Sequence, residues 1–316
     1  MKFKSSILSL LKFFIGWPLS IIALLFVLRL ISGKLPEIIP YIKSISLFYF
    51  AIGILLFFLY YMFRSVLWKE LLKNMGHEVS YIENAYKFAV SELKRFVPGN
   101  VWSLLSRGSL FTQMGIDKES VVKGLLLEVQ LIIAGCVLVS SFSFVWILDA
   151  PDALKDKLSA ILPITFIATF IYFLVLAYIF KKKYNKKNSF ISSIYLPGLL
   201  IRSKINLTVL SFVVFAIFGL ANFFILLSLF PENLSQVIAL SSFFTLALLI
   251  GYLSFITPMG LGVREGVVTV GLLKIMTITN SGFFAIFSRA VLIISELSYL
   301  LLIFLVYKLR LKTNTK

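Results

Sequence analysis

The chain has 316 residues, of which 59% are hydrophobic and only 14% are charged, and its formal net charge at pH 7 is +17. Its apolar runs of membrane-spanning length, joined by short loops, predict an all-α polytopic membrane protein that forms a single membrane domain with no separate soluble domain. The basic excess could suggest nucleic acid, but these residues concentrate in a few loops and in the C-terminal tail, as expected beside an anionic leaflet. We therefore expect no nucleic-acid partner.

The first half begins with two apolar segments. Residues 13–30 follow three lysines and lack a small-residue cleavage site, so we interpret them as a retained first span rather than a signal peptide. A second span is predicted over residues 44–63. Arg64, Lys69 and Lys73 come next and are interpreted as marking a basic side of the membrane.

The segment after the second span is the least hydrophobic part of the chain. Ser80 and Glu83 have capping-box spacing, which predicts a helix that starts there with one apolar face. This helix is predicted to stop at Pro98 and Gly99, and a second apolar stretch follows over residues 101–114. We expect a hairpin that dips into the membrane and returns; the alternative is an amphipathic helix pair lying on the surface.

Five further spans or broken spans complete the chain. The predicted elements are a third span over 120–148, a fourth over 163–180, a fifth over 207–230, an interrupted region over 235–276 and a last span over 283–307. The termini, the region after the second span and the lysine run at 181–187 are basic, whereas the loops at 149–157 and 231–235 are not. This pattern predicts a multi-pass protein of the cell membrane with both termini in the cytoplasm.

The interrupted region contains the sequence Thr-Pro-Met-Gly-Leu-Gly-Val-Arg-Glu-Gly at 257–266. Pro258 removes a backbone donor, and Gly260 and Gly262 favour non-helical turns. Such a break at membrane depth is tolerated only where protein or a watery cavity covers it. Arg264 and Glu265 follow directly, which is how many transporters build a site at the midplane. The alternative is a kinked helix whose charges reach the interface.

These elements predict an inverted repeat. Residues 1–150 and 151–316 would each contribute an odd number of crossings and one broken hairpin, for about six full spans plus two re-entrant hairpins. A rival count treats 235–256 and 264–278 as two full spans and gives about eight crossings. Both counts are even and therefore place both termini on the same side of the membrane, so the distribution of basic residues does not distinguish the two models.

Two blocks resemble a known family. Phe-Val-Pro-Gly-Asn-Val-Trp at 96–102, followed by Arg107, and Pro-Met-Gly-Leu-Gly-Val-Arg-Glu-Gly at 258–266 are similar to motifs of the lysylphosphatidylglycerol synthase transmembrane, or flippase-like, family. Met259 stands where the family more often has glycine. The resemblance implies a membrane domain that moves lipids between leaflets. The family's aminoacyl-transferase domain is soluble and follows the membrane domain, and we expect it to be absent here.

An anionic phospholipid or polyprenyl phosphate is the expected partner, and its head needs fixed cations and helix N-termini on its way through the bilayer. Arginine suits phosphate because its planar fork binds two oxygens. The candidate substrate-binding residues are Lys94, Arg95, Pro98, Gly99, Trp102, Arg107, Glu128, Pro258, Gly260, Gly262, Arg264, Glu265, Arg289 and Glu296. Arg289 and Glu296, two turns apart, are expected to face the bundle interior, with a structural ion pair as the alternative role; Trp102 is alternatively an interface anchor.

An enzyme is the alternative hypothesis. Some relatives are tied to lipid-linked glycan assembly, so a membrane-embedded glycosyltransferase or an accessory subunit stays open, and Glu92 with Glu128 would be its acid pair. The sequence has no Asp-x-Asp motif, no P-loop and no His–Cys cluster. Its only cysteine, Cys136, lies in an apolar run, and its only histidine, His77, is expected to be a solvated loop residue. We expect no catalytic residues, no metal and no cofactor. The expected protein partners are a second copy of the chain or enzymes of lipid or glycan synthesis.

Overall fold

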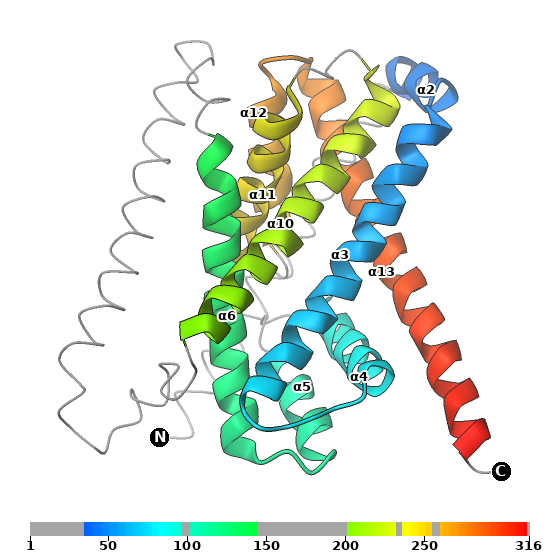
Figure 1. The fold of residues 1–316 in the computed structure, drawn as a ribbon. Helices are drawn as coiled ribbons and strands as arrows, with labels where there is room; N and C mark the ends of the chain where they lie inside the picture. The colour runs from blue at the N-terminus through cyan, green and yellow to red at the C-terminus, as the bar shows by residue number, and fades with distance from the viewer. Residues whose placement is uncertain (1–34, 97–101, 144–200, 232–235, 255–259, 315–316) are drawn as a thin grey trace, which may run out of the picture.

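The computed structural model describes residues 35–96, 102–143, 201–231, 236–254 and 260–314 (Figure 1). Every regular element in these ranges is helical, as predicted. In chain order the elements are α2 (Leu35–Lys43), α3 (Leu47–Asn74), α4 (Tyr81–Leu93), the 3-10 helix η1 (Lys94–Phe96), α5 (Trp102–Thr112), α6 (Lys118–Ser140), the 3-10 helix η2 (Ser141–Ser143), α10 (Ile201–Leu229), α11 (Val237–Leu253), α12 (Val263–Leu272) and α13 (Ile278–Asn314).

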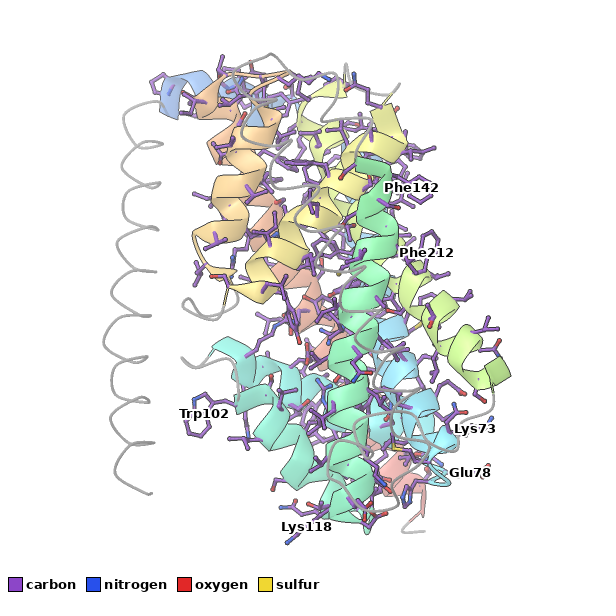
Figure 2. All side chains as sticks on the ribbon, turned by 90° about the vertical axis from the view of Figure 1, so that its left-hand side faces the viewer. Lys73, Glu78, Trp102, Lys118, Phe142 and Phe212 are labelled. Atoms are coloured by element: carbon purple, nitrogen blue, oxygen red, sulfur yellow. The ribbon has the colours of Figure 1, made fainter. Side chains whose placement is uncertain are left out.

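Four of these helices, α3, α6, α10 and α13, are long and apolar enough to cross a membrane. Their composition and length confirm the prediction of a helical membrane protein. Large apolar side chains such as Leu301 and Leu305 are exposed on α13, as expected for a surface that faces lipid. Figure 2, a view from the side, shows apolar and charged side chains in different places: Phe142 and Phe212 lie along the length of the bundle, whereas Lys73, Glu78 and Lys118 lie at one end.

The long helices pack through aromatic rings and small residues. Tyr60 of α3 lies 5.2 Å from the ring of Phe218 on α10, so the two helices interlock along their length. Gly219 of α10 faces α11, where an added Cβ would lie 2.2 Å from the carbonyl oxygen of Ser241. Small residues at helix contacts allow the close backbone approach that drives association in lipid.

Two pairs of short helices occupy opposite ends of the bundle (Figure 1). The first helix pair, α4 with η1 and α5, lies where α3 ends and α6 begins. The second helix pair, α11 and α12, lies where α10 ends and α13 begins. The 13 residues of α4 and the 10 residues of α12 measure roughly 20 Å and 15 Å, well short of a hydrocarbon core of about 30 Å.

The start of α4 confirms the capping prediction. Ser80 is the N-cap, and its side chain accepts a hydrogen bond of 3.4 Å from the backbone N–H of Glu83. This interaction satisfies one of the free donors of the first turn. The helix then tightens into η1 before the Pro98–Gly99 break, which lies outside the described residues.

The second span is longer than predicted. Helix α3 begins at Leu47 and continues to Asn74, about three turns beyond the predicted end at residue 63. Arg64 therefore does not mark a basic side of the membrane: it lies inside the bundle with 8% of its surface exposed. The helix continues past this charge because two glutamates neutralise it, as described below.

The last span also exceeds its prediction at both ends, since α13 covers 37 residues from Ile278 to Asn314. Its final turns carry Lys308, Arg310 and Lys312 beyond the apolar part, at the end where α3 stops. The predicted spans over 13–30 and 163–180, the loop at 149–157 and the lysine run at 181–187 lie outside the described residues.

Candidate functional site

A closed ring of four charges connects the first helix pair to the long helices. Arg64 of α3 donates to Glu92 of α4 at 2.6 Å and to Glu128 of α6 at 3.2 Å. Arg107 of α5 bonds the other oxygen of each of these two glutamates. All four residues are at least nine-tenths buried, and the Arg107 guanidinium lies 4.1 Å from the ring centroid of Phe88.

The ring explains how four charges are kept inside the bundle. A lone ion in an apolar interior is strongly destabilising, whereas a fully paired and hydrogen-bonded group is tolerated. Removing one partner from a buried pair typically costs about 3–5 kcal/mol because the other charge is left uncompensated. The ring therefore fixes α4 and α5 against α3 and α6, one charge from each helix.

Arg95 extends this ring to α13. It donates to Glu92 at 3.0 Å and also bonds Glu296, so it bridges the first helix pair and the last long helix. The hydroxyl of Tyr61 on α3 donates to the same Glu296 oxygen at 3.1 Å. We call the six ions Arg64, Glu92, Arg95, Arg107, Glu128 and Glu296 the central charge cluster. With three arginines and three glutamates, it is neutral.

A second charge cluster lies at the start of α12. Glu265 accepts from Arg289 of α13 at 2.5 Å and from the backbone N–H of Gly262 at 2.8 Å. Arg264, next to it in the chain, donates to the amide oxygen of Asn222 on α10 at 3.1 Å, and its guanidinium lies 5.3 Å from the ring centroid of Phe218. We call Arg264, Glu265 and Arg289, with Asn222, the second charge cluster.

Arg264 differs from the other buried arginines. Arg64, Arg107 and Arg289 each have at least one carboxylate within ion-pairing distance, but no carboxylate of the described residues lies that close to Arg264. Its exposed fraction is only 4%. The second cluster, with two arginines and one glutamate, therefore carries an excess positive charge inside the membrane domain. Because such a charge is unfavourable in an apolar interior, an anion bound beside Arg264 would stabilise it.

Glycines shape the backbone around Arg264. Gly260 has a φ of +65° and Gly262 a φ of +84°, in the left-handed region that favours glycine. A Cβ on Gly260 would lie 2.5 Å from the backbone of Gly251, so α11 and the start of α12 approach each other closely. Gly251 also faces Arg264, where an added Cβ would lie 3.0 Å from the arginine Cβ. This packing fixes where the Arg264 side chain leaves the backbone.

The structure divides the predicted site residues into three groups. Arg95, Arg107, Glu128 and Glu296 lie in the central charge cluster, and Gly260, Gly262, Arg264, Glu265 and Arg289 build the second one. Lys94 is exposed, and Trp102 is 47% exposed and points away from the bundle (Figure 2). Pro98, Gly99 and Pro258 lie outside the described residues.

Several residues of the two clusters were not predicted as site residues. Tyr61 and Arg64 follow an apolar run and look like the end of a span, but the helix continues through them. Asn222 lies about two turns before the end of α10 and is 1% exposed. An amide inside an apolar span is the one signal in the sequence that marks this residue, because a polar group there needs a partner.

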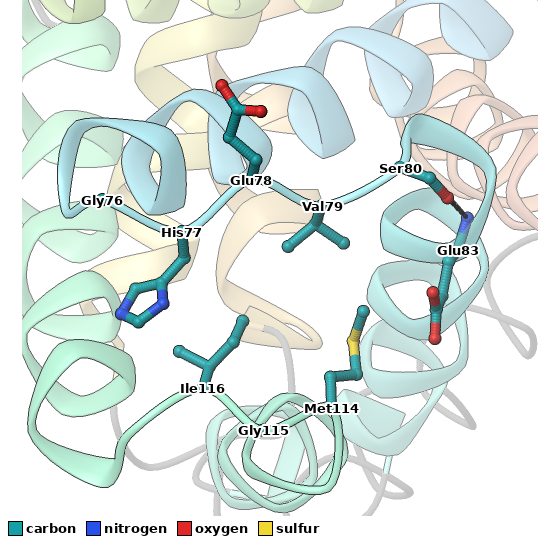
Figure 3. Close-up of a pocket in the computed structure, with 9 residues that line it drawn as sticks. All are labelled: Gly76, His77, Glu78, Val79, Ser80, Glu83, Met114, Gly115 and Ile116. Atoms are coloured by element: carbon teal, nitrogen blue, oxygen red, sulfur yellow. Dashed lines mark hydrogen bonds between the residues drawn. The ribbon is translucent and has the colours of Figure 1, made fainter.

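A polar pocket of about 340 Å³ lies at the end of the bundle where α3 stops (Figure 3). His77 lies on its rim, in the loop after α3, where it is partly exposed and its Nε2 lies 2.9 Å from Asp117. The hydrogen bond from the backbone N–H of Ser120 and the contact with His77 hold the pKa of Asp117 below its usual value. Asp117 caps the start of α6, so this pair fixes the turn between α5 and α6.

No protein-family model matches the chain, and a comparison with curated proteins gives no match. The functional argument therefore depends on the two charge clusters and on the arrangement of the helices around them.

Proposed function

We propose that this chain is a flippase-like membrane transporter that carries an anionic lipid, a phospholipid or a polyprenyl phosphate, between leaflets. The observation that carries this proposal is Arg264, a buried arginine with no carboxylate partner among the described residues. A phosphate bound there would supply the missing negative charge. The planar guanidinium has free donors for two phosphate oxygens once Asn222 has taken one.

The arrangement of the helices supports an inverted repeat. In chain order, α3, α4, α5 and α6 follow the pattern long, short, short, long, and α10, α11, α12 and α13 repeat it. The short pairs lie at opposite ends of the bundle (Figure 1). With α12 at roughly 15 Å, the count of about six crossings and two re-entrant hairpins fits better than about eight crossings. Midplane sites between inverted repeats with broken helices are typical of transporters.

The orientation follows from charge. Lys69, Lys73, Lys118, Lys308 and Arg310 lie at the end that holds the first helix pair. Basic residues of this kind mark the cytoplasmic side, so the first helix pair would enter the membrane from the cytoplasm and the second pair from outside. This orientation also places the C-terminus in the cytoplasm.

We do not assign an acid–base role to Glu92 and Glu128. Both oxygens of each carboxylate accept hydrogen bonds from arginines, so neither carboxylate presents an unbonded oxygen to a substrate in this arrangement. A glycosyl-transfer reaction would need another pair of acidic groups.

Transport in liposomes tests the proposal. Purified protein is reconstituted with fluorescent phosphatidylglycerol, and the accessible fraction of the label is followed with a membrane-impermeant quencher. Arg264→Ala should slow transport by roughly 10- to 100-fold, the rate change that corresponds to a charge-assisted interaction of about 1.5–3 kcal/mol. Arg264→Lys should recover only part of the rate because the ammonium lacks the two-pronged geometry.

Arg310→Ala is the matched control. Like Arg264, this arginine has a single hydrogen bond to a neutral oxygen, the hydroxyl of Ser80, but it is exposed. Its loss should leave the rate within about twofold of wild type. Equal rates for Arg264→Ala and wild type would refute the proposal. A sugar donor added to a parallel sample separates transport from transfer, since a new glycolipid product would favour the enzyme hypothesis.

A further inference from the structure

Glu296 differs from the other buried glutamates. Glu92, Glu128 and Glu265 each have hydrogen-bond donors on both carboxylate oxygens. In Glu296, which is 3% exposed, Oε2 takes the bonds from Arg95 and Tyr61. The other oxygen, Oε1, is buried and has no hydrogen-bond partner among the described residues.

The groups that face Glu296 come from three elements. Tyr61 of α3 donates to it, Arg95 of η1 forms its ion pair, and Glu92 of α4 bonds the same arginine. Helices α12 and α10 also pack against α13, but the charges of α12 and the amide of Asn222 bond within the second cluster instead. Glu296 thus shares one arginine with a second carboxylate.

We propose that Glu296 is a proton-binding site and that protonation releases the first helix pair from α13. A carboxylate with one unbonded oxygen in an apolar interior is incompletely compensated, so a proton bound to Glu296 Oε1 would cost less than one bound to a carboxylate whose two oxygens both accept hydrogen bonds. When Glu296 becomes neutral, its ion pair with Arg95 is lost. Arg95 is not left as an uncompensated charge, because it keeps Glu92 at 3.0 Å. Separation of η1 from α13 is therefore easier in the protonated state.

The second helix pair lacks this property. Glu265 ties α12 to Arg289 of α13, but both of its oxygens are bonded, one of them to the backbone N–H of Gly262. Protonating Glu265 would break a backbone hydrogen bond as well as an ion pair. Proton binding is thus expected to act on the first helix pair alone. Proton binding at Glu296 would then couple lipid movement to the proton gradient, an extension that rests on the proposed function.

Distances between spin labels test the proposal without a transport substrate. Leu105 of α5 and Leu301 of α13 are both exposed, so cysteines at these positions can be labelled in a Cys136→Ser background. The protein is placed in nanodiscs of phosphatidylcholine, and the distance distribution is measured from about pH 8 to about pH 5. The lower end of this range lies just above the ordinary pKa of a glutamate side chain. We expect a second, longer population to appear as the pH falls.

Two variants make the result specific. Glu296→Gln resembles the protonated acid, so the longer population should be present at every pH. Tyr61→Phe keeps the ring but removes a hydrogen bond that stabilises the carboxylate, so the transition should move to higher pH. Glu265→Gln is the control and should leave the wild-type pH dependence of this distance in place.

Three outcomes would overturn the proposal: no change of distance with pH in the wild-type protein, the same transition in Glu296→Gln as in wild type, or no shift in Tyr61→Phe. These outcomes say nothing about lipid movement. Failure of transport in the liposome assay with a normal pH transition here would instead refute the proposed function and leave the proton site standing.

Discussion

Arg289 and Glu296 lie seven residues apart on α13, yet they bind different helix pairs. Arg289 holds Glu265 of α12 at 2.5 Å, and Glu296 holds Arg95 of η1. Two turns of helix place both side chains on one face of α13, and both are buried. The two contacts have opposite polarity, because α13 supplies the cation to the second helix pair and the anion to the first. A movement of α13 would therefore act on both pairs at once.

The ion pair between Arg289 and Glu265 should contribute strongly to stability. In Arg289→Gln, Glu265 loses its cation inside the bundle, and the free energy of unfolding should fall by about 3 kcal/mol or more. Denaturation in detergent, followed by tryptophan fluorescence, measures the change. The exposed Arg310→Gln serves as the control and should change stability by less than about 0.5 kcal/mol. Equal effects of the two variants would show that burial of this pair has no energetic consequence.

The closed ring of Arg64, Glu92, Arg107 and Glu128 predicts that a second substitution restores stability lost through the first. Arg107→Met leaves Glu92 and Glu128 each with one donor fewer and should destabilise the protein by about 3–5 kcal/mol. Adding Glu128→Met removes the second charge, and Arg64 with Glu92 then remains as a direct pair at 2.6 Å. Because a buried pair is often replaceable by apolar residues of similar volume, the double variant should be more stable than Arg107→Met alone. If the double variant instead lost the summed stability of the two single variants, the closed ring of charges would be contradicted.

Gly260 and Gly266, six residues apart in the chain, offer a matched comparison. Gly260→Ala places a Cβ against the backbone of Gly251 at a left-handed φ, so we expect a loss of roughly 1–3 kcal/mol. Gly266, six residues on and within α12, has nothing within 4 Å of an added Cβ. Gly266→Ala should therefore be neutral or stabilise by up to about 1 kcal/mol. Thermal unfolding of both variants measures the difference, and the reverse order would refute the close approach of α11 and α12.

The sequence was sufficient to predict the helical class and the starts of α4 and α12 because both depend on local patterns. Ser80 marked the start of α4 through its capping spacing, and the glycines before Arg264 marked the start of α12. The charge partners could not be predicted in this way. Arg95 pairs with Glu296 from the far end of the chain, and the end of α3 was set too early because Arg64 is neutralised by residues of other helices. Such pairings depend on tertiary structure.

The central claim is that Arg264 binds the charge of the lipid head, and headgroup selectivity tests it most directly. Liposomes that contain wild type or Arg264→Gln are given fluorescent phosphatidylglycerol or fluorescent phosphatidylcholine with the same acyl chains, and the ratio of the two transport rates is determined. Our account predicts that wild type prefers the anionic lipid and that Arg264→Gln brings the ratio close to one. A slower variant with the wild-type ratio would show that Arg264 supports the fold rather than the lipid charge, and would contradict the account.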